Sequence, residues 1–333
     1  MRRITIRHIA EKAGVSINTA SRALNGKPDV SPETRERVLR IASELHYIPN
    51  RFARGLRSSF TGTIGVVVTD IANPFFGALV KGIEESATEK GYSIILCDTD
   101  EQTGREKAAI QLMFQEQVDG VLLTPVQEEL TVVRSLKKQG FPFVLLGRYF
   151  EELQTDYVVT DDFKGGVLAT EHLIEQGCRR IIHIQGPPYI SSAKERLKGY
   201  LETLRRHGIS GEALVTEPAI TMEDGYRITG RVIRELKPDG IFAFSDFVAL
   251  GVLRALREEG LRVPEDVALV GYDDVDFASY LMPPLSTVRI PKEELGRVSL
   301  DLLCKRIRGE LDEPAEVKLD VELIVRDSSR PKR

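Results

Sequence analysis

The first 60 residues contain three short stretches in which apolar residues recur every three or four positions, as on one face of a helix. Thr5, Ser16 and Ser31 precede these stretches, and their hydroxyls can accept hydrogen bonds from the free amides at a helix start. Gly14 lies between the first two stretches, where a tight turn favours a left-handed backbone. We therefore predict three helices around one small core, with the first two joined as a helix-turn-helix.

From residue 63 onward, short apolar runs alternate with longer amphipathic stretches. The runs predict strands at 64–69, 92–97, 120–124, 143–146, 157–160, 181–185, 240–244 and 267–271. The stretches between them predict helices at 74–89, 105–117, 165–176, 192–207, 224–236 and 247–259, followed by a helix near 292–308 and a last strand near 317–325. This alternation is typical of parallel sheets with helices on both faces, so we predict an α/β body of two doubly wound parallel sheets behind an all-α head.

Charge divides the chain at the same place. Residues 1–60 hold 12 Lys and Arg against 5 Asp and Glu, about +7, whereas the rest holds 34 against 45, or −11. A basic arm on an acidic body indicates a polyanionic partner for the arm alone.

Composition excludes several classes of protein. No apolar run is long enough to span a bilayer, and the basic N-terminus is not followed by the apolar stretch of a secretory signal, so we expect no membrane partner. Three distant cysteines are typical of a reducing cytosol, and we expect a cytoplasmic protein that joins the nucleoid when bound to DNA. No phosphate-binding, nucleophile-elbow or zinc motif is present, so we expect no catalytic residues, no metal and no cofactor.

The predicted second helix carries side chains that can read base pairs. Its outward positions are Ile17, Asn18, Ser21 and Arg22. Asparagine can pair with adenine, arginine with guanine, and isoleucine can pack on a thymine methyl group. Short hydroxyl donors suited to phosphate oxygens stand at Ser16, Thr19 and Ser21. The alternative interpretation is an ordinary solvated helix face.

The head motif resembles the DNA-binding head of the lactose-repressor (LacI/GalR) family. The matching residues run from Thr5-Ile6 through Ile9-Ala10, Ala13-Gly14-Val15-Ser16, Thr19, Ser21-Arg22, Leu24-Asn25-Gly26 and Val30-Ser31-Pro32 to Tyr47 and Pro49-Asn50. The likeness covers nearly the whole chain. It extends the candidate DNA contacts to Thr5, Asn25, Asn50, Arg51, Ala53, Arg54 and Leu56.

The segment after the head carries three arginines that alternate with apolar residues. The resemblance implies a hinge helix that orders in the minor groove of the operator, with Leu56 as an apolar wedge and Ala53 beside it. A plain interdomain linker is the alternative. We predict a head at 1–49, a hinge at 50–60 and a body at 61–333. The body is expected to form one lobe from 61–160 and 291–318 and another from 161–290 and 319–330.

Ligands of open parallel sheets bind beyond the carboxyl ends of the strands, and polar or aromatic residues follow several predicted strands here. The candidates are Phe75, Phe76, Arg148, Arg196, Ser245 and Asp273. The resemblance implies that the aromatics stack on a sugar or base, and that Arg196 and Asp273 bind neighbouring hydroxyls. Gly147, Ile220 and Ser245 depart from the pattern of ribose-binding relatives. Asp161, Asp162 and Asp246 stand at helix starts, which favours helix capping.

These observations predict a transcription regulator, a repressor, in which two heads of a homodimer read a pseudo-palindromic site on double-stranded DNA. A small-molecule effector, a sugar and specifically a pentose such as ribose, would control it. The alternatives are a regulator that responds to a purine, a nucleoside or a partner protein, and a stand-alone cytosolic sugar-binding protein.

Overall fold

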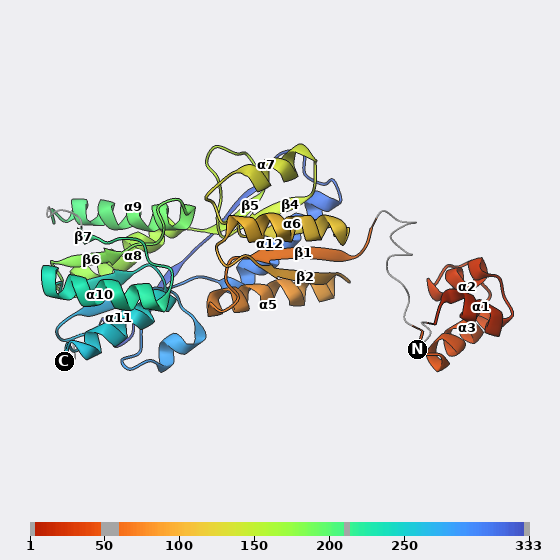
Figure 1. Cartoon of the computed structure of the whole chain (residues 1–333), viewed down its shortest axis with the longest axis horizontal. Helices are drawn as coiled ribbons and strands as arrows, with labels where there is room; N and C mark the ends of the chain where they lie inside the picture. The colour runs from red at the N-terminus through yellow and green to blue at the C-terminus, as the bar shows by residue number, and fades with distance from the viewer. Residues whose placement is uncertain (1–3, 48–59, 210–213, 330–333) are drawn as a thin grey trace. The chain divides into compact units, whose positions relative to one another are not determined.

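The computed structural model describes residues 4–47, 60–209 and 214–329. It divides into a small helical unit that ends at Thr61 and a large unit from Gly62 onward (Figure 1). In the part of the chain that is described, no helix is both long enough and apolar enough to cross a membrane.

Within its described residues 4–47, the small unit contains the three predicted helices: α1 (Ile6–Ala13), α2 (Ile17–Leu24) and α3 (Pro32–Glu44). Ser16 and Ser31 cap α2 and α3, since each hydroxyl accepts a hydrogen bond from the amide three residues later, at 3.0 and 3.3 Å. Gly14 ends α1 with a left-handed φ of 64°. The three helices share one core, made of Ile9, Ala10, Ala13, Ala20, Ala23, Val30, Val38, Ile41 and Ala42.

The first sheet of the large unit is parallel throughout, in the order β11-β5-β4-β3-β1-β2. Its strands are β1 (Thr63–Val68), β2 (Ser93–Asp98), β3 (Gly120–Leu123), β4 (Phe143–Leu146), β5 (Tyr157–Thr160) and β11 (Glu316–Leu319). Its helices are α5 (Pro74–Glu89), α6 (Thr103–Gln115), α7 (Thr131–Lys138) and α12 (Lys292–Ile307).

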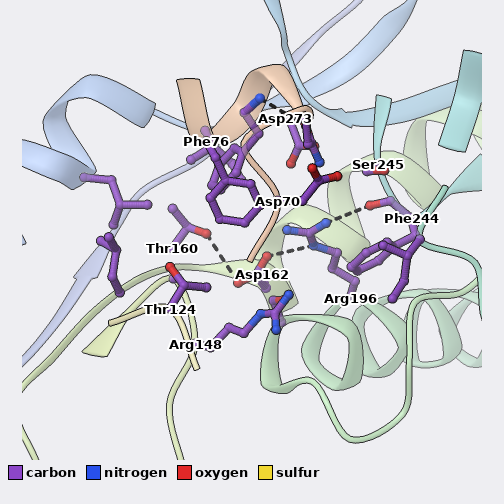
Figure 2. A pocket seen from close by; sticks show the side chains of 18 of the residues that line it. Asp70, Phe76, Thr124, Arg148, Thr160, Asp162, Arg196, Phe244, Ser245 and Asp273 are labelled. Atoms are coloured by element: carbon purple, nitrogen blue, oxygen red, sulfur yellow. Dashed lines mark hydrogen bonds and ion pairs between the residues drawn. The ribbon is translucent and has the colours of Figure 1, made fainter. Parts of the chain in front are cut away.

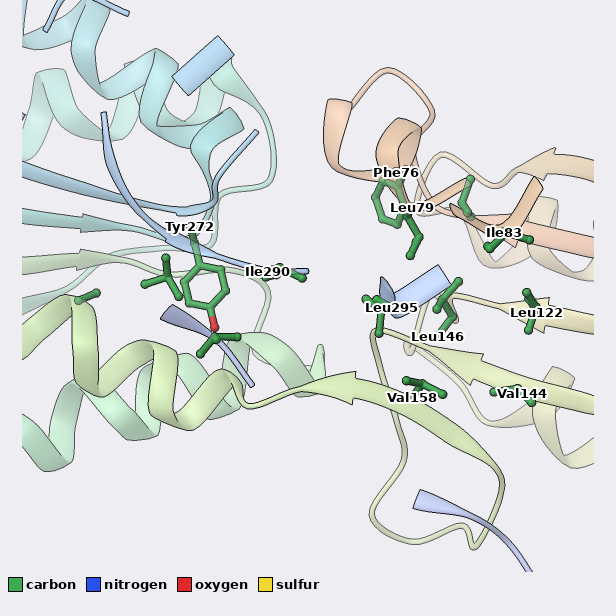
Figure 3. Close-up of a cluster of buried hydrophobic side chains, with 14 of the residues drawn as sticks. Phe76, Leu79, Ile83, Leu122, Val144, Leu146, Val158, Tyr272, Ile290 and Leu295 are labelled. Carbon is green, nitrogen blue, oxygen red and sulfur yellow. The ribbon is translucent and has the colours of Figure 1, made fainter. Parts of the chain in front are cut away.

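Alternate strand residues of this sheet enter two different cores. Val66 and Leu122 pack with α5 and α12, whereas Val67 and Val121 pack with α6 and α7. Both faces are therefore covered, which explains the continuous apolar runs in the strands. Figure 3 shows the α5 side, where Phe76 and Leu79 lie near Leu146 and Leu295.

The second sheet has the order β12-β10-β9-β8-β6-β7 and is parallel except for β12, which runs antiparallel to β10. Its strands are β6 (Ile181–Ile184), β7 (Leu214–Val215), β8 (Gly240–Ala243), β9 (Ala268–Asp273), β10 (Ser286–Arg289) and β12 (Glu322–Ile324). Its helices pack in pairs, α8 (Asp162–Glu175) with α9 (Ser191–Arg206) and α10 (Met222–Leu236) with α11 (Asp246–Glu258); a short 3₁₀ helix, η1 (Asp276–Tyr280), follows β9.

The chain passes between the two sheets three times: from β5 to α8, from β10 to α12 and from β11 to β12 (Figure 1). The single last strand expected near 317–325 is therefore wrong, because residues 320–321 carry the chain from one sheet to the other. The elements α7, β7 and β10 were not predicted. Strand β9 also continues past the predicted end at residue 271, and this extension places Asp273 at the strand terminus.

Helices α8 and α9 approach until their backbones touch. A Cβ atom added at Gly166 would lie 2.3 Å from the carbonyl oxygen of Arg196, and one added at Gly199 would lie 2.3 Å from the carbonyl oxygen of Phe163. Any larger residue at either glycine would push the helices apart. The two glycines thus fix α9, and with it Arg196, against the first turn of α8.

We expect Gly166→Ala to lower the free energy of unfolding by about 1–3 kcal/mol, because the added methyl group meets backbone that cannot turn aside. The matched control is Gly230→Ala in α10, where an added Cβ meets nothing within 4 Å. That change should stabilise the chain by up to about 1 kcal/mol through helix propensity. Urea unfolding of both variants measures the difference, and equal stabilities would contradict the close packing of α8 and α9.

Candidate functional site

The predicted recognition helix α2 presents its outward residues to solvent. Ile17 exposes 45% of its surface, Asn18 and Arg22 are also exposed, and the buried residues of the helix are Ala20 and Ala23. The other candidate DNA contacts of the described head are exposed or half-buried: Thr5, Ser16, Thr19, Ser21 and Asn25. Asn50, Arg51, Ala53, Arg54 and Leu56 lie outside the described residues.

Several of these side chains already have partners within the head, Arg22 and Asn25 among them. Arg22 forms an ion pair with Asp29 in the loop between α2 and α3. The hydrogen bond between them raises the pKa of Arg22 and lowers the pKa of Asp29. Asn25 Nδ2 donates to the carbonyl oxygen of Ser21 at 2.7 Å, one helical turn earlier. The candidate guanine reader is therefore held by a neighbouring carboxylate.

A cavity of about 80 Å³ lies between the carboxyl ends of the two sheets (Figure 2). All six predicted ligand-binding residues line it: Phe75, Phe76, Arg148, Arg196, Ser245 and Asp273. Gly147 and Ile220, which depart from the pattern of ribose-binding relatives as Ser245 does, line it too. The remaining lining residues are Asp70, Asn73, Glu101, Thr124, Leu146, Thr160, Asp162, Ser192, Phe244, Ile290 and Leu295.

Arg196 is 5% exposed and is held on several sides. Its Nε donates to Asp162 Oδ1 at 2.8 Å, and its Nη1 donates to the carbonyl oxygen of Phe244 at 2.7 Å (Figure 2). The guanidinium carbon lies 3.6 Å from the ring centre of Tyr272, within the range of a cation–π contact. Burial opposes the charge of Arg196, but the carboxylates of Asp162 and Asp273 outweigh it and raise the pKa of Arg196.

Asp273 ends strand β9 with a φ of +112°, a region that residues with a side chain rarely adopt. Lys292, at the start of α12, donates from Nζ to the carbonyl oxygens of Asp273 and Asp274, at 2.7 Å each. A helix of the first sheet thereby holds the strained turn of the second. Burial raises the pKa of the Asp273 carboxyl to about 7, although Arg196 acts to lower it.

Arg148 follows β4 and is 8% exposed. Its two terminal nitrogens donate to the two carboxylate oxygens of Glu101, at 2.9 and 2.5 Å, and Nη1 also donates to the carbonyl oxygen of Pro125 at 2.9 Å. The pair is bidentate, the geometry in which arginine binds a carboxylate most strongly. Arg148 therefore enters the pocket as half of an ion pair.

Aromatic rings and one unpaired hydroxyl complete the lining. Phe75 and Phe76 meet edge to face with ring centres 5.0 Å apart at the start of α5, which Asn73 caps by accepting the Phe75 amide at 3.1 Å. Phe244 follows β8 and lies against Arg196. The hydroxyl of Thr124 is buried without a hydrogen-bond partner, so a polar ligand would satisfy it.

Two of the three aspartates expected to cap helices have other roles. Asp161 caps α8, since its Oδ1 accepts the Lys164 amide at 3.0 Å. Asp162 is instead the partner of Arg196, and Asp246 is fully buried, where it accepts the Val275 amide at 2.9 Å. The cap of α11 is the predicted ligand residue Ser245, whose hydroxyl accepts the Val248 amide at 3.2 Å.

A ring of hydrogen bonds joins the two sheets beside the pocket. Gln127, which follows β3, donates from Nε2 to the carbonyl oxygen of Tyr149 at 2.7 Å. Its Oε1 accepts from the amide and hydroxyl of Ser191, the first residue of α9, at 3.0 and 3.3 Å. The Ser191 hydroxyl in turn accepts the Tyr149 amide at 3.0 Å. The described residues contain no cluster of side chains able to hold a metal ion.

Between about pH 4 and 7 the folded chain binds a proton at Asp273 that the unfolded chain has released. The contribution of Asp273 to the free energy of unfolding therefore falls as the pH rises through this window. We expect wild type to lose on the order of 1–3 kcal/mol more than Asp273→Asn between pH 5 and 8, measured by urea unfolding. The exposed Asp276→Asn is the control, and parallel curves for wild type and Asp273→Asn would contradict this assignment.

Comparisons with known proteins agree with this architecture. Residues 5–50 match the model of the lacI family of bacterial regulatory proteins, and residues 170–329 match that of periplasmic binding protein-like domains. The ribose operon repressor of Halalkalibacterium halodurans is 37% identical over 328 residues, which cover 98% of this chain and 97% of the relative.

Solved structures extend the likeness. A lac repressor dimer bound to operator and an anti-inducer is 29% identical and superposes with a TM-score of 0.90 over 99% of this chain and all of that one. A complex of the regulator CelR with cellobiose is 37% identical, with a TM-score of 0.75 over 98% of this chain and all of the other. A LacI family regulator from Enterococcus faecium with bound ribose is 33% identical, with a TM-score of 0.74 over 81% of this chain and all of the other.

The helix-turn-helix head, the two-sheet body and full-length relatives together leave no place for a stand-alone binding protein. The chain belongs to the LacI family of bacterial regulatory proteins and is a transcriptional regulator.

Proposed function

We propose that this regulator is a homodimeric repressor that binds a pseudo-palindromic operator through α2. A neutral monosaccharide that binds in the pocket would either weaken or strengthen the binding of the repressor to DNA. The observation that carries the proposal is the pairing of a buried Arg196 with Asp162 beside Asp273, in a cavity lined by aromatic rings. Charged groups of both signs bind sugar hydroxyls strongly, and aromatic rings pack on the apolar faces of sugars.

The charges of the pocket favour a neutral ligand. Four carboxylates line it against two arginines, and each arginine already forms an ion pair. A purine with its flat ring would use the aromatics but would offer fewer hydrogen-bonding groups than a polyol to Asp273 and to the unpartnered hydroxyl of Thr124, at a cost in binding free energy. The polar lining therefore favours a polyol over a base.

The cavity volume favours a monosaccharide. The cavity of about 80 Å³ is small beside the roughly 300–1,000 Å³ of drug-sized ligand sites, which supports a small ligand such as a monosaccharide. Ribose, bound in one similar structure, is the first candidate, and cellobiose, bound in another, is the second.

The dimer is supported by an exposed apolar surface on the second sheet's lobe. Tyr280 and Met282 are 84% and 92% exposed, and Met282 borders a groove that Leu250, Leu253 and Leu281 also line. Exposed apolar surface of this kind marks protein interfaces. We propose that a second copy of this chain covers this surface, because the similar lac repressor structure is a dimer.

The proposed divisions are a head at 1–49, a hinge at 50–60 and a body at 61–333. Within the body, 61–160 and 291–318 would form one lobe and 161–290 and 319–330 the other. A DNA-binding repressor acts where the chromosome lies, so we propose the cytoplasm as its place, with the nucleoid as its location when it is bound to operator.

We expect Arg22→Ala to weaken operator binding by about 1–3 kcal/mol and to relax the base preference at one position of each half-site, because a bidentate contact to guanine is lost. Selection of bound sequences from a random pool measures the preference. The control variant Arg40→Ala, on α3, also removes one positive charge but should leave the base preference unchanged. If Arg22→Ala keeps the base preference of wild type, Arg22 does not read a base.

A thermal-shift series on the full chain tests the effector. At a concentration of 100 times Kd, ribose should add roughly 2.7 kcal/mol to the free energy of unfolding, and Asp273→Ala should lose this shift while it still binds DNA. The same series includes glucose, cellobiose and adenine. A shift with cellobiose alone would reject the monosaccharide, and a shift with adenine alone would reject the sugar.

A further inference from the structure

Arg148 stands where an incoming anion would be expected to bind. Its guanidinium group lies on the pocket wall at the end of β4, is 8% exposed, and carries a planar fork of donors that fits a phosphate as well as a carboxylate. Glu101 fills this fork from inside the protein, with both oxygens within 2.9 Å of the terminal nitrogens. The carboxylate of Glu101 thus occupies the position that a ligand phosphate would need.

The backbone places Glu101 there through an unusual turn. Glu101 follows β2, and both Asp100 and Glu101 have a φ of +51°, in the left-handed region. The Glu101 amide donates to the carbonyl oxygen of Thr69 at 3.2 Å, and Asp98 accepts the Asp100 amide at 3.0 Å. These bonds fold the loop after β2 toward β4, so that a residue 47 positions away in the sequence reaches Arg148.

Among the described lining residues, the other arginine is also held by a carboxylate. The second lining arginine, Arg196, is paired with Asp162. The two remaining lining carboxylates, Asp70 and Asp273, form no side-chain ion pair among the described residues. A phosphate entering this pocket would displace Glu101 and would share the cavity with Asp70, whose carboxylate repels it at short range.

We propose that Glu101 is a specificity-determining residue, which neutralises Arg148 and makes the pocket reject phosphorylated sugars in favour of the neutral ones. This inference rests on the proposed sugar-binding function and adds to it the discrimination between a sugar and its phosphate ester. Glu101 would provide this discrimination by weakening the binding of the phosphate ester, because its carboxylate repels a phosphate group.

The test is Glu101→Gln in the full chain, which keeps the size of the side chain and removes its charge. Isothermal titration gives Kd for D-ribose, D-ribose 5-phosphate, D-glucose, D-glucose 6-phosphate and inorganic phosphate. We expect the ratio of Kd for phosphate ester to Kd for parent sugar to fall by about tenfold or more relative to wild type, and inorganic phosphate to become a measurable ligand.

Two controls separate release of Arg148 from a general loss of negative charge. Asp70→Asn removes a pocket carboxylate that forms no ion pair with any described arginine, and its effect on the ratio should be several-fold smaller. Glu101→Gln combined with Arg148→Gln should lose the gain. If thermal unfolding shows that Glu101→Gln does not fold, Glu101→Ala takes its place. We expect the same fall in the ratio of Kd values for that variant.

The outcomes distinguish this inference from the proposed function. A Glu101→Gln chain that binds ribose or glucose but gains no affinity for either ester or for inorganic phosphate overturns the role of Glu101 alone. Wild type that binds ribose 5-phosphate as tightly as ribose overturns it too. If wild type binds no sugar, the proposed function fails, and the inorganic phosphate titration still decides whether Glu101 blocks Arg148.

Discussion

A buried guanidinium group is the constraint on which the body of this protein depends. Arg196 has left water almost completely, and an unpaired charge at that depth would be strongly destabilising, so Asp162 has to lie within hydrogen-bond distance. Backbone contact between α8 and α9, which Gly166 and Gly199 permit, holds the two side chains at this distance. The close packing of α8 against α9 and the charge pair in the pocket therefore depend on each other.

Much of the fold could be predicted from the chain because apolar periodicity follows burial. Strands covered on both faces become continuous apolar runs, and most of these runs were assigned correctly. The split of the last strand into β11 and β12 was missed, because its alternating pattern continues through residues 320–321 without a glycine or proline to mark the crossing. Strand β7, with two residues, is too short to leave a pattern.

The pocket was predictable where topology alone decides it. Residues after strand ends converge at a sheet edge, and this rule brought Phe76, Arg148 and Asp273 together. Glu101 was missed because a left-handed turn built from aspartate and glutamate carries no glycine to reveal it. Asp162 was misread because an aspartate at a helix start looks like a cap, and only the three-dimensional position of Arg196 identifies it as a charge partner.

The hydrogen-bond ring of Gln127, Tyr149 and Ser191 bears on how the two lobes could separate. Its four bonds share three residues, so releasing one residue breaks at least two bonds at once. Three of the four bonds join Ser191 in α9 to Gln127 and Tyr149 beside the first sheet, so separation at this point breaks all three. None of the three side chains lines the cavity, yet the fraction of molecules in the closed form scales the apparent affinity of any ligand that requires closure. Effector sensitivity in this chain can thus be set by residues that never touch the effector.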